Sequence, residues 1–458
     1  MLEASLFDFE SSTKAADFSS VYSNQELSEK LNKLELLYKV KNEEDRFEAL
    51  VNMSTSGNKP YYRWAKYREG YSGELVKELI RRSGVDSKKQ FVYDPMSGSG
   101  STITAGLEEG FDALGNDVSP YAVDVTQAKI TCCSEAVLQE VQQFITAPLD
   151  QECIRAWKDL SALKIYFQTE HLAVIQQIAN KIHSLENEDA RKLLFVAWLM
   201  SLEDASERKK DGNGLATRPS PIHDIWARFV LQIKMMLSDL REYPLPRFPK
   251  RKIALQSAMS SAELVYEFAK ETGKELGAII FSPPYANSFD YFESYKLELL
   301  GGYYTPDELI RARETTIRSY RKGYRYQLQT DLALVEMLCQ EVRCRIPEKE
   351  KEIGKLDNRS RLVPNLLIGY FEDMKIVLQG LAKAAPPGSY CHIVVDQSSY
   401  LGVIIPTDIV LATIGEMFGF EVQEIIRCRS ARTSPQQLTR YPYLKYMLRE
   451  SIVSLRKL

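Results

Sequence analysis

Three observations predict an α/β protein with a doubly wound, Rossmann-like sheet and a largely helical insertion. Residues 91–117 follow the order strand, Gly/Ser turn, helix, strand, which is typical of the opening of such a sheet. Residues 135–245 have helical periodicity instead, which predicts a helical insertion. Apolar strand segments return at 277–281 and 390–395, so the sheet is expected to continue after the insertion.

The first elements follow from local patterns. Leucines at helical spacing predict a charged helix at about residues 24–45. An aromatic and basic loop occupies Tyr61–Tyr71, and Gly73–Ile80 is predicted to be a helix. The short apolar run Phe91–Tyr93 predicts a strand that ends at Asp94.

After the glycine turn, a helix is expected from about Ser101, and Asp112–Asp117 predicts a second strand that ends in an acid. Pro120 is expected to open another helix. Inside the insertion, the apolar run Leu193–Met200 is too short to cross a bilayer and predicts a buried core helix. Tyr243–Pro249 contains three prolines in seven residues, which cannot continue a helix and therefore end the insertion.

The second half of the chain begins with the strand predicted at Gly277–Phe281. A long helical and basic segment follows over 290–385. The chain then closes with a strand at Tyr390–Val395, a helix at about 406–418 and a strand at Glu421–Ile426. These strands are expected to complete the sheet.

The composition excludes several classes of protein. Apolar residues make up 44% and charged residues 26% of the chain, which rules out a mainly disordered or fibrous protein. No stretch approaches the roughly 18 apolar residues of a membrane helix, and the first residues lack the pattern of a signal peptide, so a cytoplasmic protein is predicted. Seven cysteines without paired C-x-x-C spacing and four scattered histidines predict reduced thiols and no metal site.

The turn DPMSGSGST at Asp94–Thr102 is the first candidate ligand site. A glycine turn after a strand-end acid lets the backbone approach a nucleoside-like ligand closely. It is not a phosphate-binding P-loop because it contains no lysine, and Ile103 makes it a poor dinucleotide fingerprint. Asp117 lies 19 residues after Gly98 at the end of the next strand, where an acid can accept hydrogen bonds from ribose hydroxyls. Neither motif distinguishes a dinucleotide from S-adenosylmethionine.

The tetrapeptide Ser282-Pro-Pro-Tyr285 follows the strand at 277–281. Two consecutive prolines remove two N–H donors and leave carbonyl oxygens able to accept hydrogen bonds. The Ser282 side chain and the Pro283 carbonyl could therefore hold the two hydrogens of an exocyclic amine. Tyr285 offers a flat face for a base that has left its stack.

With these motifs, the sequence resembles the amino-methyltransferase family of DNA modification enzymes over most of its length. Asp94–Gly100 is similar to the family's cofactor loop, Gly115–Pro120 to its ribose-binding segment and Ser282–Tyr285 to its catalytic tetrapeptide. Tyr67–Val76 is similar to the motif that closes over the methionine end of the cofactor, and the tail from residue 432 is similar to family C-termini. The resemblance implies a methyltransferase sheet, the cofactor S-adenosyl-L-methionine and in-line transfer of its methyl group without a metal.

The resemblance assigns roles to residues and to parts of the chain. The predicted cofactor-binding residues are Tyr71, Ser72, Asp94, Pro95, Ser97, Gly98, Ser99, Gly100 and Asp117, and the predicted catalytic residues are Ser282, Pro283, Pro284 and Tyr285. The predicted parts are an N-terminal helical extension (1–58), a cofactor-binding part (59–135), a helical insertion as candidate target-recognition region (136–250) and a catalytic part (251–458) with a basic insertion at about 300–365.

The acceptor is predicted from the first residue of the tetrapeptide. Serine at position 282 resembles enzymes that methylate the N4 amine of cytosine, whereas enzymes for the N6 amine of adenine mostly carry aspartate or asparagine there. Methylation at cytosine C5 is disfavoured because the chain has no Pro-Cys dipeptide to supply a thiolate. An RNA base or a protein amide as acceptor, or a nucleic-acid-binding protein without turnover, are the remaining alternatives.

The net charge of −3 does not by itself point to a polyanion, but basic residues are clustered. Arginine and lysine can neutralise phosphates, and arginine also reads guanine edges. The resemblance implies double-stranded DNA as the partner of these clusters, with a possible restriction endonuclease acting separately. A further basic stretch contains Arg427, Arg429, Arg432 and Arg440. The predicted DNA-binding residues are Arg208, Lys209, Lys210, Arg218, Arg318, Arg321, Lys322 and Arg325.

Overall fold

The structure is a computed structural model of the chain. It describes residues 16–19, 21–52, 57–65, 67, 70–149, 156–211, 214–320, 327–431 and 433–458. Three of the predicted DNA-binding residues, Arg321, Lys322 and Arg325, lie outside the described residues, as does Arg432.

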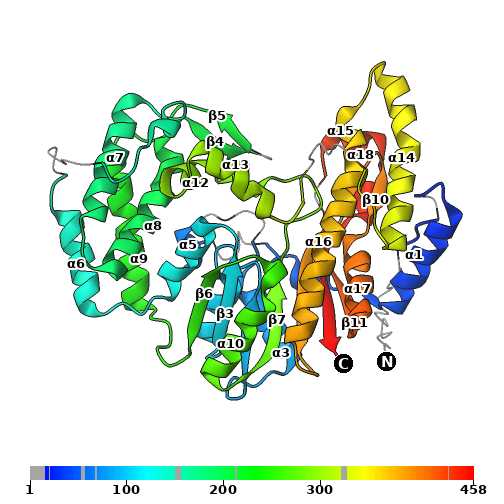
Figure 1. Cartoon of the computed structure of the whole chain (residues 1–458), viewed down its shortest axis with the longest axis horizontal. Helices are drawn as coiled ribbons and strands as arrows, with labels where there is room; N and C mark the ends of the chain where they lie inside the picture. The colour runs from blue at the N-terminus through cyan, green and yellow to red at the C-terminus, as the bar shows by residue number, and fades with distance from the viewer. Residues whose placement is uncertain are drawn as a thin grey trace, which may run out of the picture.

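The central sheet of the described part has eight strands in the order β1-β11-β12-β8-β7-β2-β3-β6 (Figure 1). The five strands from β8 to β6 are parallel, whereas β12 runs antiparallel between β8 and β11. The strands are β1 (Val40–Asn42), β2 (Gln90–Asp94), β3 (Asp112–Asp117), β6 (Arg251–Leu255), β7 (Glu275–Phe281), β8 (Tyr390–Asp396), β11 (Phe420–Ser430) and β12 (Arg449–Lys457).

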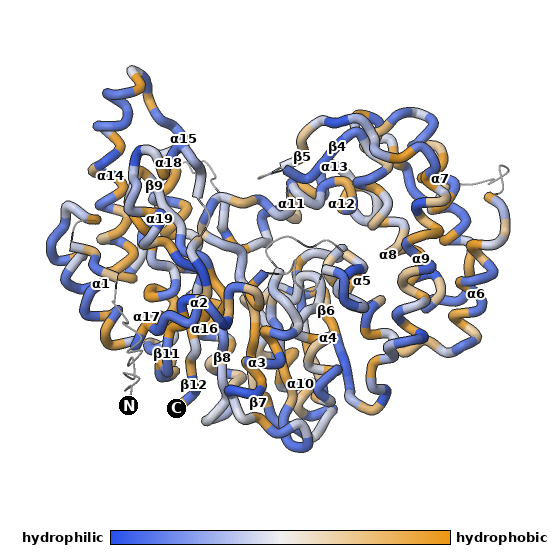
Figure 2. Tube along the Cα trace, turned by 180° about the vertical axis from the view of Figure 1, so that it is seen from behind, coloured by the Kyte–Doolittle hydropathy of each residue, from blue (hydrophilic) through white to orange (hydrophobic). Residues whose placement is uncertain are grey.

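Helices cover both faces of this sheet, which confirms the predicted doubly wound, Rossmann-like fold. Successive side chains of a strand point to opposite faces, and β2 shows the result: Val92 joins one buried core, whereas Phe91 and Tyr93 join the other. Apolar residues are concentrated along these strands and on the inward sides of the helices (Figure 2). The first core takes α3 (Gly73–Ser83), α4 (Ser101–Glu108) and α5 (Pro120–Ile130), and the second takes α10 (Ala262–Thr272), α16 (Val363–Ala384) and α17 (Thr407–Met417).

The predicted insertion is helical and forms the left-hand part of the molecule in Figure 1. Its helices are α6 (Glu135–Thr146), α7 (Thr169–His183), α8 (Glu188–Ala205) and α9 (Ile225–Glu242). Leu193–Met200 lies within α8 and is largely buried, as predicted. The short helices α11 (Tyr291–Ser294), α12 (Lys296–Gly302) and α13 (Pro306–Ala312) follow the tetrapeptide and join this helical lobe, where α12 packs on α8.

Two regions differ from the prediction. The N-terminal helix is shorter than expected: α1 (Gln25–Leu37) ends before Lys39, whose φ is +49°, and β1 and α2 (Glu44–Phe47) follow. Residues 40–42 instead form the edge strand of the sheet, where their backbone pairs with β11. The insertion, predicted from its helical periodicity, also contains two strands, β4 (Arg208–Asp211) and β5 (Gly214–Thr217), which pair antiparallel as a hairpin.

Further elements were not predicted individually. Pairing with β3 and β8 makes β6 and β12 part of the sheet. The other elements are α14 (Ala333–Ile353), α15 (Asn358–Arg361), β9 (Ser398–Tyr400), β10 (Val403–Ile405), α18 (Pro435–Arg440) and α19 (Leu444–Met447), with 3-10 turns at Tyr62–Trp64, Ser161–Leu163, Ala258–Ser260 and Arg313–Thr315. Within the described ranges, none of the helices combines the length and apolarity needed to cross a bilayer.

Candidate active site

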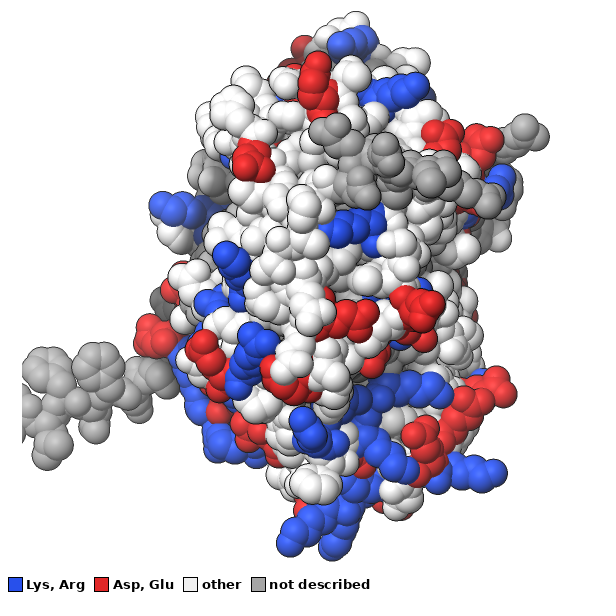
Figure 3. All heavy atoms as spheres, turned by 90° about the vertical axis from the view of Figure 1, so that its left-hand side faces the viewer, with Lys and Arg blue, Asp and Glu red and all other residues white. Residues whose placement is uncertain are grey.

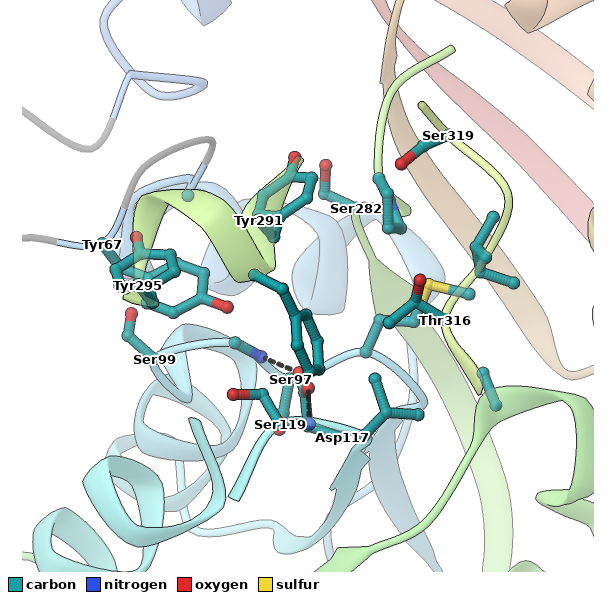
Figure 4. A pocket seen from close by; sticks show the side chains of 18 of the residues that line it. Tyr67, Ser97, Ser99, Asp117, Ser119, Ser282, Tyr291, Tyr295, Thr316 and Ser319 are labelled. Carbon is teal, nitrogen blue, oxygen red and sulfur yellow. Dashed lines mark hydrogen bonds between the residues drawn. The ribbon is translucent and has the colours of Figure 1, made fainter. Parts of the chain in front are cut away.

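A cavity opens at the carboxyl ends of β2, β3, β6 and β7, where open α/β sheets bind their ligands. Including the space open to solvent, its volume is about 1080 Å³. In Figure 4, Ser97, Asp117 and Ser119 lie on one side of it, and Ser282, Tyr291 and Ser319 lie on the other. The predicted site residues that line the cavity are Tyr71, Pro95, Ser97, Gly98, Ser99, Asp117, Ser282 and Pro284.

Asp94 lies just behind the cavity wall and holds two parts of the site together. Its carboxylate accepts hydrogen bonds from the Met96 amide at 3.0 Å and from the Tyr71 hydroxyl at 3.1 Å. The Tyr71 oxygen also lies 2.6 Å from Thr102 Oγ1. Burial raises the pKa of Asp94 to about 7. Asp94 therefore fixes Tyr71 against the glycine turn.

The glycine turn requires its glycines at two positions. Gly98 and Gly100 have φ of +50° and +79°, in the left-handed region that glycine favours. A Cβ atom on Gly98 would lie 2.8 Å from the Tyr67 ring, and one on Gly100 would lie 2.7 Å from Thr126. Gly100 therefore allows Thr126 to pack closely against the turn, whereas Gly98 allows the Tyr67 ring to lie directly over the turn.

Asp117 at the end of β3 is tied to the same turn. Its carboxylate accepts hydrogen bonds from the amides of Gly98 and Ser119, both at 2.9 Å (Figure 4). Burial raises the pKa of Asp117, although these hydrogen bonds oppose the shift. Asp117 lines the cavity, as a residue that binds ribose hydroxyls must.

The turn also contains a buried polar atom that is available to a ligand. Ser97 Oγ is buried in the cavity wall and has no hydrogen-bond partner among the described residues. The neighbouring Ser99 is fixed from behind, because its carbonyl accepts a hydrogen bond from the buried ammonium group of Lys129 at 2.6 Å. A buried polar atom without a partner costs free energy, so Ser97 fits a ligand that supplies a hydrogen bond. Together with the exposed edge of Asp117, this donor and acceptor set fits a nucleoside-like cofactor.

Like Asp94, the predicted cofactor-binding residues Ser72 and Gly100 do not line the cavity. Ser72 caps the N-terminus of α3, where its side chain accepts a hydrogen bond from the Leu75 amide at 3.2 Å, and its hydroxyl donates to the Leu50 carbonyl at 2.7 Å. Its position supports the segment that carries Tyr71. Direct contact of Ser72 with a cofactor stays a prediction.

The tetrapeptide begins at the end of β7, opposite the glycine turn. Ser282 and Pro284 line the cavity, whereas Pro283 and Tyr285 are not among its lining residues. The Tyr285 side chain is only 4% exposed, and its hydroxyl donates to Glu450 at 3.0 Å. The Ser282 hydroxyl donates to the Tyr285 oxygen at 3.4 Å. The stacking of a base on Tyr285 stays a prediction that would require this ring to become accessible.

The wall beside the tetrapeptide comes from residues that sequence reasoning did not single out. It combines aromatic rings with small hydroxyl side chains from the segment that follows the tetrapeptide: Tyr291, Phe292, Tyr295, Thr316, Ser319 and Tyr320. The ring of Tyr295 stacks on Tyr67 at a centroid distance of 4.9 Å and on Tyr121 at 5.1 Å. The sequence signal for this wall is the run of aromatic residues after Tyr285. In the structure, Tyr295 of this run stacks on Tyr67, which lies over Gly98.

The predicted DNA-binding residues of the hairpin differ in their surroundings. Lys209 is exposed, whereas the Lys210 side chain is 9% exposed and forms salt bridges with Glu298 and, at 3.4 Å, with Glu203. Arg208 and Arg218 donate hydrogen bonds to backbone carbonyls around the hairpin. Phosphate contact stays a prediction, and Lys209 has the side chain most open to it.

Other arginines predicted from charge clusters are engaged within the protein. Arg318 binds both carboxylate oxygens of Asp373, with its Nε 2.9 Å from Oδ2. The arginines near the C-terminus form ion pairs with acidic residues from other elements: Arg427 with Glu44, Arg429 with Glu450 and Arg440 with Glu352. These pairs favour structural roles for those four arginines.

A second cavity in the described part is more basic than the first. It lies between α5, α9 and the loop before β6 and includes Lys129, Arg241, Arg247 and Arg251 in its wall. On the face shown in Figure 3, which carries the helical lobe, lysine and arginine side chains gather toward the lower end among acidic ones.

No group of three or more His, Cys, Asp or Glu side chains in the described ranges is placed to hold a metal ion.

Known proteins similar to this chain are methyltransferases. The chain is 28% identical over 408 residues to the type II methyltransferase M.AvaI from Nostoc sp. and from Anabaena variabilis, with 82% of each chain covered. It is 25% identical over 470 residues to the type II methyltransferase M.BsoBI from Geobacillus stearothermophilus, with 88% of this chain and 87% of that protein covered. No family model matches the sequence.

A solved structure, the rRNA methyltransferase AviRa from Streptomyces viridochromogenes, aligns with a TM-score of 0.28 at 10% identity, covering 84% of this chain and 85% of that one. The sequence relatives confirm the resemblance to DNA methyltransferases that the motifs predict. They do not distinguish the N4 amine of cytosine from the N6 amine of adenine.

Proposed function

We propose that the protein is an S-adenosylmethionine-dependent DNA methyltransferase that modifies the exocyclic N4 amine of cytosine in duplex DNA. The observation that carries this proposal is one cavity with two different walls. The turn at Gly98 and the Asp117 carboxylate form one wall, and Ser282 of the tetrapeptide lies in the other. A cofactor and an amine acceptor can therefore meet between them.

Residues on the first wall would hold the cofactor. Asp117 is placed to accept hydrogen bonds from ribose hydroxyls, and Ser97 Oγ is buried there without a partner among the described residues. The stacked rings of Tyr67 and Tyr295 lie beside the turn and offer faces that attract a cation. The cofactor, when bound, supplies a sulfonium methyl group that an amine nitrogen can attack.

Residues on the second wall would hold the acceptor. Ser282 Oγ and the Pro283 carbonyl are expected to accept hydrogen bonds from the two N–H groups of the amine, which favours a pyramidal nitrogen with an available lone pair. Most of the rate acceleration would come from position, because a well-placed pair of reactants gains up to about 7–11 kcal/mol. In this proposal, neither a metal nor a general base is obligatory for methyl transfer.

Two features support the choice of substrate. Serine at position 282 favours cytosine N4 over adenine N6 in the family that the sequence resembles. The similarity to type II methyltransferases over more than four fifths of the chain supports DNA as the substrate and a role as the modification enzyme of a restriction system. In such a system, a restriction endonuclease would act as a separate protein.

The test is to incubate the protein with methyl-labelled S-adenosylmethionine and DNA amplified in vitro, which carries no prior methylation. The DNA is then digested to nucleosides and analysed by mass spectrometry. Labelled N4-methyl-2′-deoxycytidine is the expected product. N6-methyl-2′-deoxyadenosine would refute the base assignment but not the enzyme class, and label in protein, in RNA supplied in a parallel reaction or nowhere would refute DNA methylation.

A matched pair of variants would connect the activity to this cavity. Asp117→Ala should abolish most of the transfer because it removes a carboxylate from the cavity wall. Asp112→Ala changes the other end of the same strand, where the Asp112 carboxylate likewise accepts a backbone hydrogen bond, from Lys250 at 2.7 Å. The Asp112→Ala variant should keep its activity at temperatures where it remains folded.

A further inference from the structure

A chain of hydrogen bonds runs from the cavity wall into the sheet. Ser282 Oγ lies 3.4 Å from the Tyr285 hydroxyl oxygen, which lies 3.0 Å from Glu450 Oε1. Glu450 is near the start of β12, 165 residues after Tyr285. The antiparallel position of β12 beside β8 brings it next to the tetrapeptide.

The direction of these hydrogen bonds is determined at the Glu450 end. An ionised carboxylate can only accept, so the single hydroxyl hydrogen of Tyr285 must point to Glu450. The Tyr285 oxygen then accepts the hydroxyl hydrogen of Ser282. With its own hydrogen committed, Ser282 Oγ presents lone pairs to the cavity.

The surroundings of Glu450 suit a carboxylate that accepts hydrogen bonds. Its side chain is 4% exposed and forms an ion pair with Arg429, its neighbour on β11. Burial of a carboxylate costs free energy unless it is paired with a charge and hydrogen-bonded. Arg429 supplies the charge and Tyr285 supplies a hydrogen bond, so both partners favour the acceptor form of Glu450.

We infer that Glu450 is a positioning residue which, through Tyr285, orients the Ser282 hydroxyl as an acceptor for the hydrogen of the target amine. This inference rests on the proposed function. It assigns the position of Tyr285 a second purpose besides any contact with a base. It also explains why a tyrosine, and not an aromatic ring without a hydroxyl, suits position 285.

The chemical consequence concerns the amine nitrogen. If Ser282 donated its hydrogen into the cavity, it would compete for the nitrogen lone pair that must attack the methyl group. With Ser282 as an acceptor, the lone pair stays available. The effect should therefore appear in the chemical step and not in the binding of cofactor or DNA.

The experiment compares wild-type protein with Tyr285→Phe, Glu450→Gln and the double variant. Glutamine keeps the size of glutamate but can donate as well as accept, so it no longer determines the direction of the chain. Each single variant should lower kcat by about 10- to 100-fold, with the KM for cofactor and for DNA changed less than about 3-fold. The double variant should be no slower than the slower single variant, because both changes break the same chain.

Matched controls come from a similar pair far from the cavity. Tyr38 donates its hydroxyl hydrogen to Glu416 at 2.7 Å, and both residues lie on the α1 and α17 side of the sheet. Tyr38→Phe and Glu416→Gln make the same chemical changes and should leave kcat unchanged. Thermal unfolding and calorimetric titration with S-adenosylhomocysteine would verify that each variant folds and binds.

The outcomes separate the inference from the proposed function. If wild-type protein methylates no cytosine or adenine amine, the proposed function fails and the inference fails with it. If wild-type protein is active and Glu450→Gln keeps kcat within about 2-fold, or if the two losses multiply in the double variant, the inference alone is wrong. Should Glu450→Gln fail to fold, Tyr285→Phe tests the inference alone, because it removes only one oxygen atom. A kcat within about 2-fold of wild type in this variant would then contradict the inference.

Discussion

The ammonium group of Lys210 lies 4.7 Å from the centre of the Tyr295 ring. Lys210 belongs to the hairpin of the helical lobe, and Tyr295 stacks on Tyr67, which lies over Gly98. A continuous series of contacts therefore connects the candidate target-recognition region with the proposed cofactor site. Lys210 also forms salt bridges with Glu298 and Glu203, so its charge is part of this connection.

Lys210→Met should destabilise the protein and weaken cofactor binding. Without Lys210, the buried carboxylate of Glu298 loses its partner, which costs about 3 kcal/mol in the free energy of unfolding. Lys210 also helps to hold the Tyr295 ring against Tyr67, so its loss should loosen the cavity wall beside Gly98 and raise the Kd for S-adenosylmethionine about 3- to 10-fold. The exposed neighbour Lys209 is the matched control, and Lys209→Met should change neither value in urea denaturation and calorimetry. Equal effects of the two variants would contradict the proposed connection.

Gly98→Ala should weaken cofactor binding more than backbone strain alone explains. The added Cβ atom would lie 2.8 Å from the Tyr67 ring, so the ring must move away from the turn. We expect the Kd for S-adenosylmethionine to rise at least about 10-fold. Gly110→Ala is the control, because Gly110 also has a positive φ, of +78°, but no atom lies within 4 Å of the added Cβ. A similar Kd for both variants would show that Tyr67 does not matter.

The fold was largely predictable because its signals are local. Strand and helix patterns around the glycine turn place β2, α4 and β3 within a residue or two of their predicted bounds. The strands β6 and β12 were not predicted, because these segments become strands through pairing with β3 and β8, which are distant in sequence. The N-terminal helix was predicted too long because β11 offers an edge with which residues 40–42 pair.

Placement in the cavity wall was predictable where one motif supplies the geometry, as at Gly98, Asp117 and Ser282. It was not predictable where distant segments meet. The Tyr285–Glu450 contact joins residues far apart in the sequence, and nothing local to either residue indicates it. Charge clusters were the weakest guide, because arginines such as Arg318 bind acids that only the fold brings near.

The pH dependence of stability should reveal the buried acid behind the cavity. Burial raises the pKa of Asp94 to about 7, whereas the usual value is 3.8. Between these values the folded protein holds a proton that the unfolded chain releases, so stability falls as pH rises. Relative to Asp94→Asn, which cannot titrate, wild-type protein should lose about 3 kcal/mol between pH 5 and pH 8. Urea denaturation across this range measures the difference, and a constant difference would show that Asp94 has an ordinary pKa in the folded protein.

The buried ion pairs of Arg449 should be essential for the stability of the C-terminal half of the sheet. Arg449 on β12 bonds to Glu35 of α1 and to Asp408 of α17, and all three side chains are at most 2% exposed. Glu35→Gln removes one of the two charges that balance the buried guanidinium, which should lower the free energy of unfolding by about 3 kcal/mol. Glu26→Gln changes an exposed residue of the same helix and should shift it by less than about 0.5 kcal/mol.

Although Arg449 precedes Glu450 on the same strand, the loss of the Glu35 charge should affect the site only through unfolding of the protein. At a temperature where Glu35→Gln is fully folded, kcat should stay close to the wild-type value, because the chain from Glu450 to Ser282 is intact. As the temperature approaches the lowered melting point, activity should fall together with the folded fraction measured by circular dichroism. A low kcat in the fully folded Glu35→Gln protein would instead mean that the ion pairs of Arg449 take part in positioning Glu450.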